Sequence, residues 1–178
     1  MNDALDSLES QIGKTRDYES PPLHLWHPPL SGDIAIRIAS DGTWFHEGSV
    51  IKRDALVRLF ASILRREDDG DYYLVSPYEK WRVQVESHPL IVTDFDWSEE
   101  GGQRVLVASL NTDTQWTVST KHPLYFDETV GAVTIAIPHG LTALSNRAAW
   151  YRLIEMADVQ EDYALLRSGD FELRIPTQ

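Results

Sequence analysis

The chain has 178 residues with 16 basic and 28 acidic side chains, a formal net charge of −12, and no cysteine. This acidic balance argues against a nucleic acid polymer as partner, because phosphate neutralisation requires a basic face, and against anionic membrane surfaces. The lack of cysteine excludes disulfides, thiolate metal sites and cysteine nucleophiles.

The chain begins with apolar residues at helical spacing. Leu5, Leu8 and Ile12 predict a short docking helix, with a frayed terminus as the alternative because so short a helix is marginal alone. The start lacks the basic and apolar parts of a signal peptide, and no apolar run nears the roughly 20 residues that span a bilayer. We therefore expect a cytoplasmic protein without membrane insertion.

A proline-rich segment follows the first helix. In "ESPPLHLWHPPL" (19–30), four prolines forbid both a helix and a central strand. Leu23, Leu25 and Trp26 give the segment apolar side chains to bury. We expect residues 1–31 to form the helix and an ordered strap.

The next segment predicts a strand, a turn and a helix. Ile34, Ile36 and Ile38 alternate with smaller or polar residues, as in a half-buried strand, and "SDGTW" supplies a hairpin turn. Apolar residues 56, 59, 60 and 63 share one face of a helix that carries three arginines and ends at "EDDGD". Two strands, "DYYLV" and "WRVQV", follow around the turn "SPYEK".

Much of this order recurs. "SDGTW" (40–44) resembles "TDTQW" (112–116), and a shift of 94 residues aligns Arg53 with Arg147 and Arg58 with Arg152. The strand Ile34–Ile38 is matched separately with Val105–Leu110, and a longer excursion, 117–138, lies between the two matches in the second repeat. We predict an α+β protein of two tandem, structurally similar repeats, 32–97 and 104–176, with the glycine pair of "SEEGGQ" (98–103) at the junction.

The strings "GDIAIRI", "GSVIKR", "LVRLFASILRREDDG" and "LVSPYEK", with the later "HPLYF", resemble a bacterial family, domain of unknown function 1285. The resemblance implies a duplicated α+β domain whose second copy is loosely similar to a pleckstrin-homology fold. It further implies a pocket for a nucleotide-like ligand between the copies and a role in signalling. It implies no established activity.

Three arginines raise a specific question. On the predicted helix Arg58 and Arg65 share a face opposite the apolar stripe, with Arg66 to one side. One interpretation is a solvated face with ion pairs to Glu67, Asp68 and Asp69. The other is a contact with an anionic ligand, since Arg65 and Arg66 align with Val159 and Gln160 and are thus specific to one repeat.

The second interpretation gives a candidate ligand site. Arginine suits an anion such as phosphate because its planar group binds two oxygens at once. A tryptophan could stack on a base, although core packing is the usual role of such a side chain. The candidate ligand-binding residues are Trp44, Arg53, Arg58, Arg65, Arg66, Lys80, Asn111 and Trp116.

Signatures of catalysis and metal binding are missing from the sequence. There is no GxxxxGK loop, GxSxG elbow or HExxH motif. His24 and His27 are three residues apart, but flanking prolines deny them a helix and no carboxylate is placed to complete a metal site. We therefore expect no catalytic residue, metal or cofactor other than the nucleotide-like ligand.

Three functions are compatible with these observations. The first is a non-catalytic module that binds an anionic small molecule between the repeats and acts in signalling. The second is a hydrolase or transferase acting on a phosphorylated small molecule, for which Glu79 and Asp113 are the residues to test. The third is a protein-interaction module that uses Trp150 and Tyr151.

Overall fold

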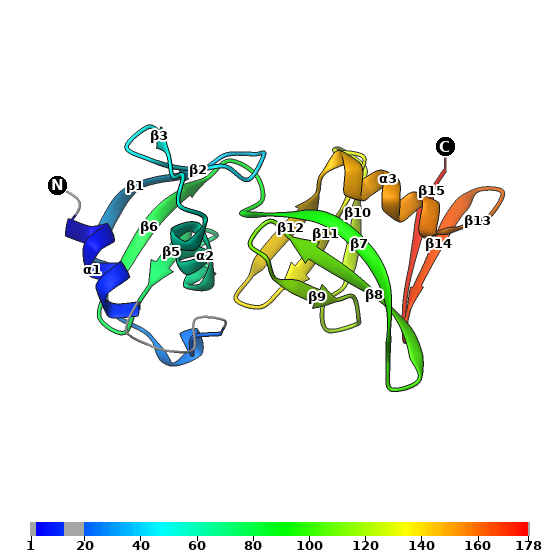
Figure 1. Ribbon diagram of the computed structural model, residues 1–178, viewed down its shortest axis with the longest axis horizontal. Coiled ribbons are helices and arrows are strands. Elements are labelled where there is room, and N and C mark those ends of the chain that lie inside the picture. Colours follow the sequence, from blue (N-terminus) through cyan, green and yellow to red (C-terminus); the bar gives the residue numbers. More distant parts are fainter. Residues whose placement is uncertain (1–2, 13–19, 178) are drawn as a thin grey trace. The chain divides into compact units, whose positions relative to one another are not determined.

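The computed structural model describes residues 3–12 and 20–177 and shows an α+β protein. The chain divides into two compact units (Figure 1). One comprises Met1–Pro89 with His139–Leu141, and the other Leu90–Pro138 with Thr142–Gln178. Within the described ranges, no helix is long and apolar enough to cross a membrane.

The first unit is built on a six-stranded sheet with the order β3-β2-β1-β6-β5-β4. Its strands are β1 (Gly32–Ile38), β2 (Trp44–His46), β3 (Ser49–Val50), β4 (Leu64–Arg66), β5 (Tyr72–Val75) and β6 (Lys80–Val85). The central pair, β1 and β6, is parallel, and the other neighbours are antiparallel. Its helices are α1 (Asp3–Ile12), η1 (Leu23–Leu25) and α2 (Asp54–Ser62).

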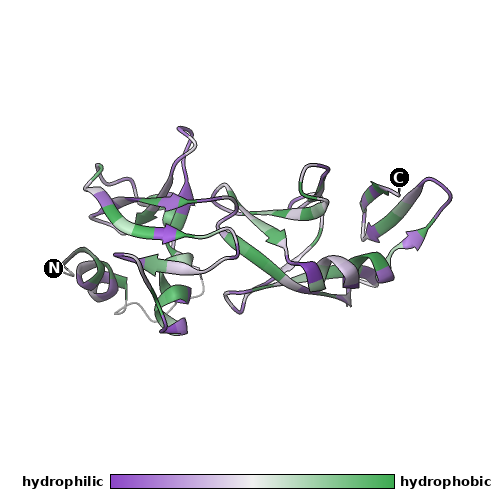
Figure 2. Ribbon diagram, turned by 90° about the horizontal axis from the view of Figure 1, so that it is seen from above, coloured by the Kyte–Doolittle hydropathy of each residue, from purple (hydrophilic) through white to green (hydrophobic). Residues whose placement is uncertain are grey.

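The first helix and the first strand confirm the sequence predictions. Leu8 and Ile12 are buried, and α1 packs beside α2, so the terminus is a docking helix. In β1, Ile36 and Ile38 are also buried, as the alternating pattern predicts. Apolar residues are concentrated in the strands and polar residues in the connections (Figure 2).

The prediction that Arg65 and Arg66 continue the helix of Arg58 is wrong. Helix α2 ends at Ser62, and both later arginines lie on β4. Ile63 leaves the helical region, and its carbonyl accepts a hydrogen bond from the Val75 N–H. Pairing with β5 therefore takes over where the apolar spacing alone favours another helical turn.

The second unit contains a six-stranded sheet with the order β10-β11-β12-β7-β8-β9. Its strands are β7 (Leu90–Glu100), β8 (Gln103–Leu110), β9 (Gln115–Thr117), β10 (Leu124–Asp127), β11 (Ala132–Ile137) and β12 (Leu141–Ser145). Helix α3 (Arg147–Met156) packs against β7 and β11. A three-stranded sheet of β13 (Asp158–Val159), β14 (Tyr163–Ser168) and β15 (Phe171–Pro176) follows.

The two six-stranded sheets have the same topology. In each, the chain starts at a central strand, moves outward through three strands, crosses to the other edge and returns to the centre. The last strand lies parallel to the first, as β6 does to β1 and β12 to β7. Strands β1 to β6 thus correspond in order to β7 to β12.

The crossover between edges differs. In the first unit it contains α2, whereas in the second it consists of residues 118–123. Such a connection reaches at most about 25 Å, and a flat sheet of six strands is about 24 Å wide. A fully extended connection would therefore only just join the two edges of a flat sheet.

This topology corrects the predicted repeat alignment. That alignment equates β1 with β8 and α2 with α3, whereas the strand order equates β1 with β7 and places no helix between β9 and β10. The pair Gly101-Gly102 lies in the hairpin turn between β7 and β8, with positive φ at both residues, and not at the boundary between units. Strands β13 to β15 form a sheet of their own.

Candidate functional site

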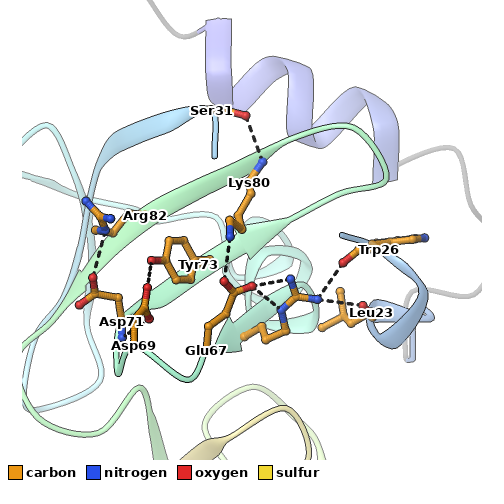
Figure 3. Close-up of polar contacts among 10 residues, drawn as sticks. Leu23, Trp26, Ser31, Glu67, Asp69, Asp71, Tyr73, Lys80 and Arg82 are labelled. Carbon is orange, nitrogen blue, oxygen red and sulfur yellow. Dashed lines mark hydrogen bonds and ion pairs between the residues drawn. The ribbon is translucent and has the colours of Figure 1, made fainter. Parts of the chain in front are cut away.

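A network of charged and polar side chains lies on β4, β5, β6 and the β4–β5 turn of the first unit (Figure 3). Arg65 donates hydrogen bonds from Nε (3.1 Å) and Nη2 (2.6 Å) to Oε2 of Glu67. Lys80 donates from Nζ to Oε1 of the same carboxylate at 2.8 Å. Two cations from different strands therefore converge on one carboxylate.

The other edge of the Arg65 guanidinium holds the strap. Its Nη1 donates to the carbonyl oxygens of Leu23 (3.0 Å) and Trp26 (2.9 Å). The Leu23 side chain is buried, and the Ser31 N–H donates to the Lys80 carbonyl at 2.7 Å. The prediction of an ordered strap is therefore confirmed for the described residues 20–31.

Tyr73 lies at the centre of the same sheet face. Its buried hydroxyl donates to Asp69, and its ring centroid lies 4.7 Å from Lys80 Nζ and 5.7 Å from Arg82 Cζ. Arg82 pairs with Asp71 at 3.2 Å and with Asp33 at 3.1 Å. The network thus continues from the strap to β1.

Two carboxylates of this network, Glu67 and Asp69, have a lowered pKa. Burial acts to raise the pKa of Glu67, but the hydrogen bonds from Lys80 and Arg65 outweigh it, so this pKa lies below its ordinary value. The hydrogen bond from Tyr73 lowers the pKa of Asp69. The same bond, followed by burial, raises the pKa of Tyr73.

The ion pair between Arg65 and Glu67 is therefore present, but it does not lie on a solvated helix face. The side chains of Arg65, Lys80 and Glu67 are only 12%, 18% and 24% exposed. At this depth the pair is shielded from solvent more than a surface salt bridge.

The remaining predicted cations lie elsewhere on the first unit. Arg53 stands at the N-cap of α2, is 67% exposed and pairs with Glu9 at 2.9 Å. Arg58 is exposed on α2. Arg66 is exposed on β4, where its Nε donates to the Gly70 carbonyl at 3.2 Å. Among the five predicted cations, the described part of the chain brings Arg65 and Lys80 together on a shared carboxylate.

The two predicted tryptophans differ by one position in their hairpins. The positive φ of the β1–β2 turn is at Gly42, two residues before Trp44, and that of the β8–β9 turn is at Asp113, three residues before Trp116. Trp44 consequently pairs with Ile38 and is buried in the core, whereas Trp116 pairs with Ala108 and takes the place of Phe45 in the first hairpin. A one-residue slip moves a side chain to the other face of a sheet.

Both tryptophans pack against other parts of the protein. Trp116 is half-buried and contacts the ring of His122 edge-on at 5.1 Å between centroids. The indole Nε1 of Trp44 has no hydrogen-bond partner among the described residues. Trp44 therefore packs in the core and is not presented to a base.

Asn111 continues the ladder of the second sheet. Its side-chain Oδ1 accepts from the Ile91 N–H at 3.1 Å, and its own N–H donates to the Ile91 carbonyl at 2.9 Å. Trp116 and Asn111 belong to the second unit, and the other six candidates belong to the first.

The residues considered for catalysis or metal binding are the next group. Glu79 accepts hydrogen bonds from Ser7 at 2.8 Å and from Gln11, which fasten α1 to the β5–β6 hairpin. Burial lowers the pKa of His122 and of His139. Within residues 3–12 and 20–177, no group of histidine, aspartate and glutamate side chains could hold a metal ion.

Sequence reasoning missed Tyr73 and Arg82 as members of the network. The signal is present in the alternation of "RRE", "DYYL" and "KWRV", which places charged and aromatic side chains on one face of three strands. The helical prediction for Arg65 conceals it, because a helix would separate these side chains.

Comparisons with known proteins agree on one family. Residues 21–88 match the N-terminal domain, described as domain of unknown function DUF1285, and residues 89–172 match the DUF1285 C-terminal domain, from a protein of unknown function. No functionally curated protein shows significant similarity to the chain.

Two solved structures are similar to it. A DUF1285 family protein from Silicibacter pomeroyi is 33% identical with a TM-score of 0.81, over 96% of this chain and 94% of the other. One from Shewanella baltica is 29% identical with a TM-score of 0.59, over 70% of this chain and 94% of the other. The chain belongs to the DUF1285 family.

Proposed function

We propose that this member of the DUF1285 family is a non-catalytic cytoplasmic module that binds an anionic, nucleotide-like small molecule and acts in signalling. The observation that carries the proposal is the convergence of Arg65 and Lys80 on a single carboxylate. We place the contact with the anionic group at these two residues of the first unit.

The arrangement suits an oxyanion for a physical reason. Charge-assisted hydrogen bonds are about twice as strong as neutral ones, and a guanidinium edge with an ammonium offers three such donors from two directions. Because both side chains are largely buried, competition from water is reduced. The carboxylate of Glu67 is itself an oxyanion in contact with both cations, which supports the proposal.

The shared strand order of the two six-stranded sheets supports the finer proposal that the units are duplicated copies. In this proposal, β1 to β6 and β7 to β12 are the equivalent elements. The likeness of the second unit to a pleckstrin-homology fold belongs to the same proposal. Its support is a six-stranded sheet, β7 to β12, followed by α3.

Calorimetric titration of a nucleotide panel tests the binding function. We expect the wild type to bind at least one nucleotide, and Arg65→Ala and Lys80→Ala each to weaken binding at least roughly tenfold. Arg53→Ala is the matched control, because it removes an exposed arginine that pairs with Glu9. Equal loss in the control, or no binding by the wild type, would refute the proposal.

A second candidate function is docking to a protein partner. Leu25 and Leu30 of the strap are exposed, and so is Tyr78 of the β5–β6 hairpin. Leu30 precedes Ser31, whose N–H bonds the Lys80 carbonyl, so the strap and this hairpin are adjacent segments. Clustered exposed apolar side chains often mark an interaction surface.

The partner function has its own test. A wild-type bait and a Leu25→Ser/Tyr78→Ser bait are compared in pull-downs from a bacterial lysate, with Tyr125→Ser as a control for an exposed aromatic of the second unit. A partner retained by wild type and control but lost by the double variant supports docking on the strap. Equal retention by all three baits excludes this surface.

A further inference from the structure

The carboxylate of Glu67 occupies the donors that the proposed ligand needs. Arg65 directs Nε and Nη2 at one of its oxygens, and Lys80 directs Nζ at the other. An external oxyanion therefore cannot reach the convergence point of these donors while Glu67 stays in place.

Both cations are held in position by groups other than Glu67. The guanidinium of Arg65 is fixed from its opposite edge by the carbonyls of Leu23 and Trp26. The ammonium of Lys80 lies over the ring of Tyr73 at 4.7 Å. The two donors are consequently expected to remain convergent when the carboxylate leaves, as a preorganised site requires.

Glu67 is the group of the three that can leave. Its backbone is fixed in the β4–β5 turn, because its N–H bonds the Asp71 carbonyl and its carbonyl accepts from the Gly70 N–H. Its side chain is the most exposed of the three and has several rotatable bonds. Rotation into solvent exposes the donors without any change in the turn.

The surroundings restrict the ligand. Asp69 and Asp71 lie on the same turn, where they are occupied by Tyr73 and Arg82. Their negative charges disfavour a di- or triphosphate, whose charge would be repelled, more than a group with one or two charges. A compact oxyanion fits best.

We propose that Glu67 is an internal competitor, and that the ligand group recognised by Arg65 and Lys80 is a single carboxylate or phosphate that takes its place. This rests on the proposed binding function and deepens it. The ligand then has to exchange with a residue of the protein, so its affinity is set partly by how readily Glu67 leaves.

The prediction is that removing the competitor's charge tightens binding. Charge-assisted hydrogen bonds contribute about 1.5–3 kcal/mol, so Glu67→Gln should bind the probe roughly ten- to hundredfold more tightly than the wild type. Glu67→Asp, whose carboxylate is one methylene farther from the donors, should fall between them. Glu9→Gln is the control, since it neutralises the carboxylate paired with Arg53.

The experiment is a calorimetric titration with two probes, inorganic phosphate and acetate, at constant ionic strength. Tighter binding of phosphate alone identifies a phosphate ligand, and tighter binding of acetate alone a carboxylate. A matched unfolding midpoint verifies that each variant is folded. The proposal fails if Glu67→Gln and Glu67→Asp both bind neither probe more tightly, or if the gain persists in Arg65→Gln/Glu67→Gln.

The two proposals can fail separately. If Glu67→Gln binds phosphate but the wild type binds no nucleotide, the proposal that Glu67 is an internal competitor stands and the nucleotide-binding function is refuted. If nucleotide binding depends on Arg65 but is unchanged in Glu67→Gln, the binding function stands and the proposal that Glu67 is an internal competitor is refuted.

Discussion

Three strands that are equivalent in the shared topology differ in their side chains: they carry cationic residues in the first unit and none in the second. In the first, β4, β5 and β6 bring Arg65, Tyr73 and Lys80 onto one face. The corresponding strands of the second, β10, β11 and β12, read "LYFD", "AVTIAI" and "LTALS" and contain neither lysine nor arginine. A sheet of this topology therefore forms without such a charged network, so the topology alone does not require it.

The largest expected loss of stability follows from removing Arg65 from the charged network of the first unit. Arg65→Ala leaves the Glu67 carboxylate without its main partner and removes the donor to two strap carbonyls. We expect a loss of about 3 kcal/mol in the free energy of unfolding, because the carboxylate is only partly exposed. Urea denaturation measures it, and Arg53→Ala, at an exposed pair, should lose less than about 1 kcal/mol. Equal losses would contradict the distinction.

In the second unit, a buried serine hydroxyl bonds two backbone groups. Ser168 accepts from the Leu106 N–H at 2.7 Å and donates to the Val118 carbonyl at 2.6 Å. Ser168→Ala leaves both backbone groups unsatisfied, and we expect a cost of about 2 kcal/mol in the free energy of unfolding. Thermal and urea unfolding measure it. An unchanged midpoint would contradict the predicted cost of losing the hydroxyl.

The helices of the two units differ in their caps. The Asn146 side chain accepts from the Ala149 N–H at 2.8 Å at the start of α3, whereas α2 has no side-chain cap. We expect Asn146→Ala to cost about 1 kcal/mol in the free energy of unfolding. Asn146→Asp, which keeps an acceptor oxygen, is the control and should stay near the wild type. A similar loss in both variants would refute the cap.

The smallest expected effect concerns pH. The pKa of Glu67 is lowered in the folded state, so its contribution is present above the unfolded pKa and is lost as pH falls through the folded pKa. The wild type should therefore lose stability on acidification in the acidic range, and Glu67→Gln should lose less. Unfolding midpoints measured from neutral to acidic pH test this, and parallel curves would contradict it.

Local sequence patterns predict where helices and strands lie better than they predict which strands pair. The alternation of Ile34, Ile36 and Ile38 identifies β1, because burial on one face imposes a period of two. The predicted helix overruns at Arg65, since the hairpin pairing of β4 with β5 buries Ile63 and Leu64. The apolar spacing of the preceding helix continues across this boundary and conceals the short strand.

The strand order could not be predicted, because it depends on pairing between segments far apart in the chain. The parallel pairing of β1 with β6 joins residues 47 to 49 positions apart. A short local match such as "DGTW" with "DTQW" gave the wrong alignment between the two units. Of the candidate site, the types of residue were predicted, and Arg65 and Lys80 do come together. Their shared carboxylate and the bonds from Arg65 to the strap required the sheet.

The central claim is that Arg65 and Lys80 form an oxyanion site that Glu67 fills in the unliganded protein. A crystal structure of the Glu67→Gln variant grown with phosphate tests it most directly. The account predicts phosphate within hydrogen-bonding distance of both the guanidinium and the ammonium, with the substituted side chain turned toward solvent. Phosphate elsewhere, with the introduced glutamine still between the two cations, would contradict it.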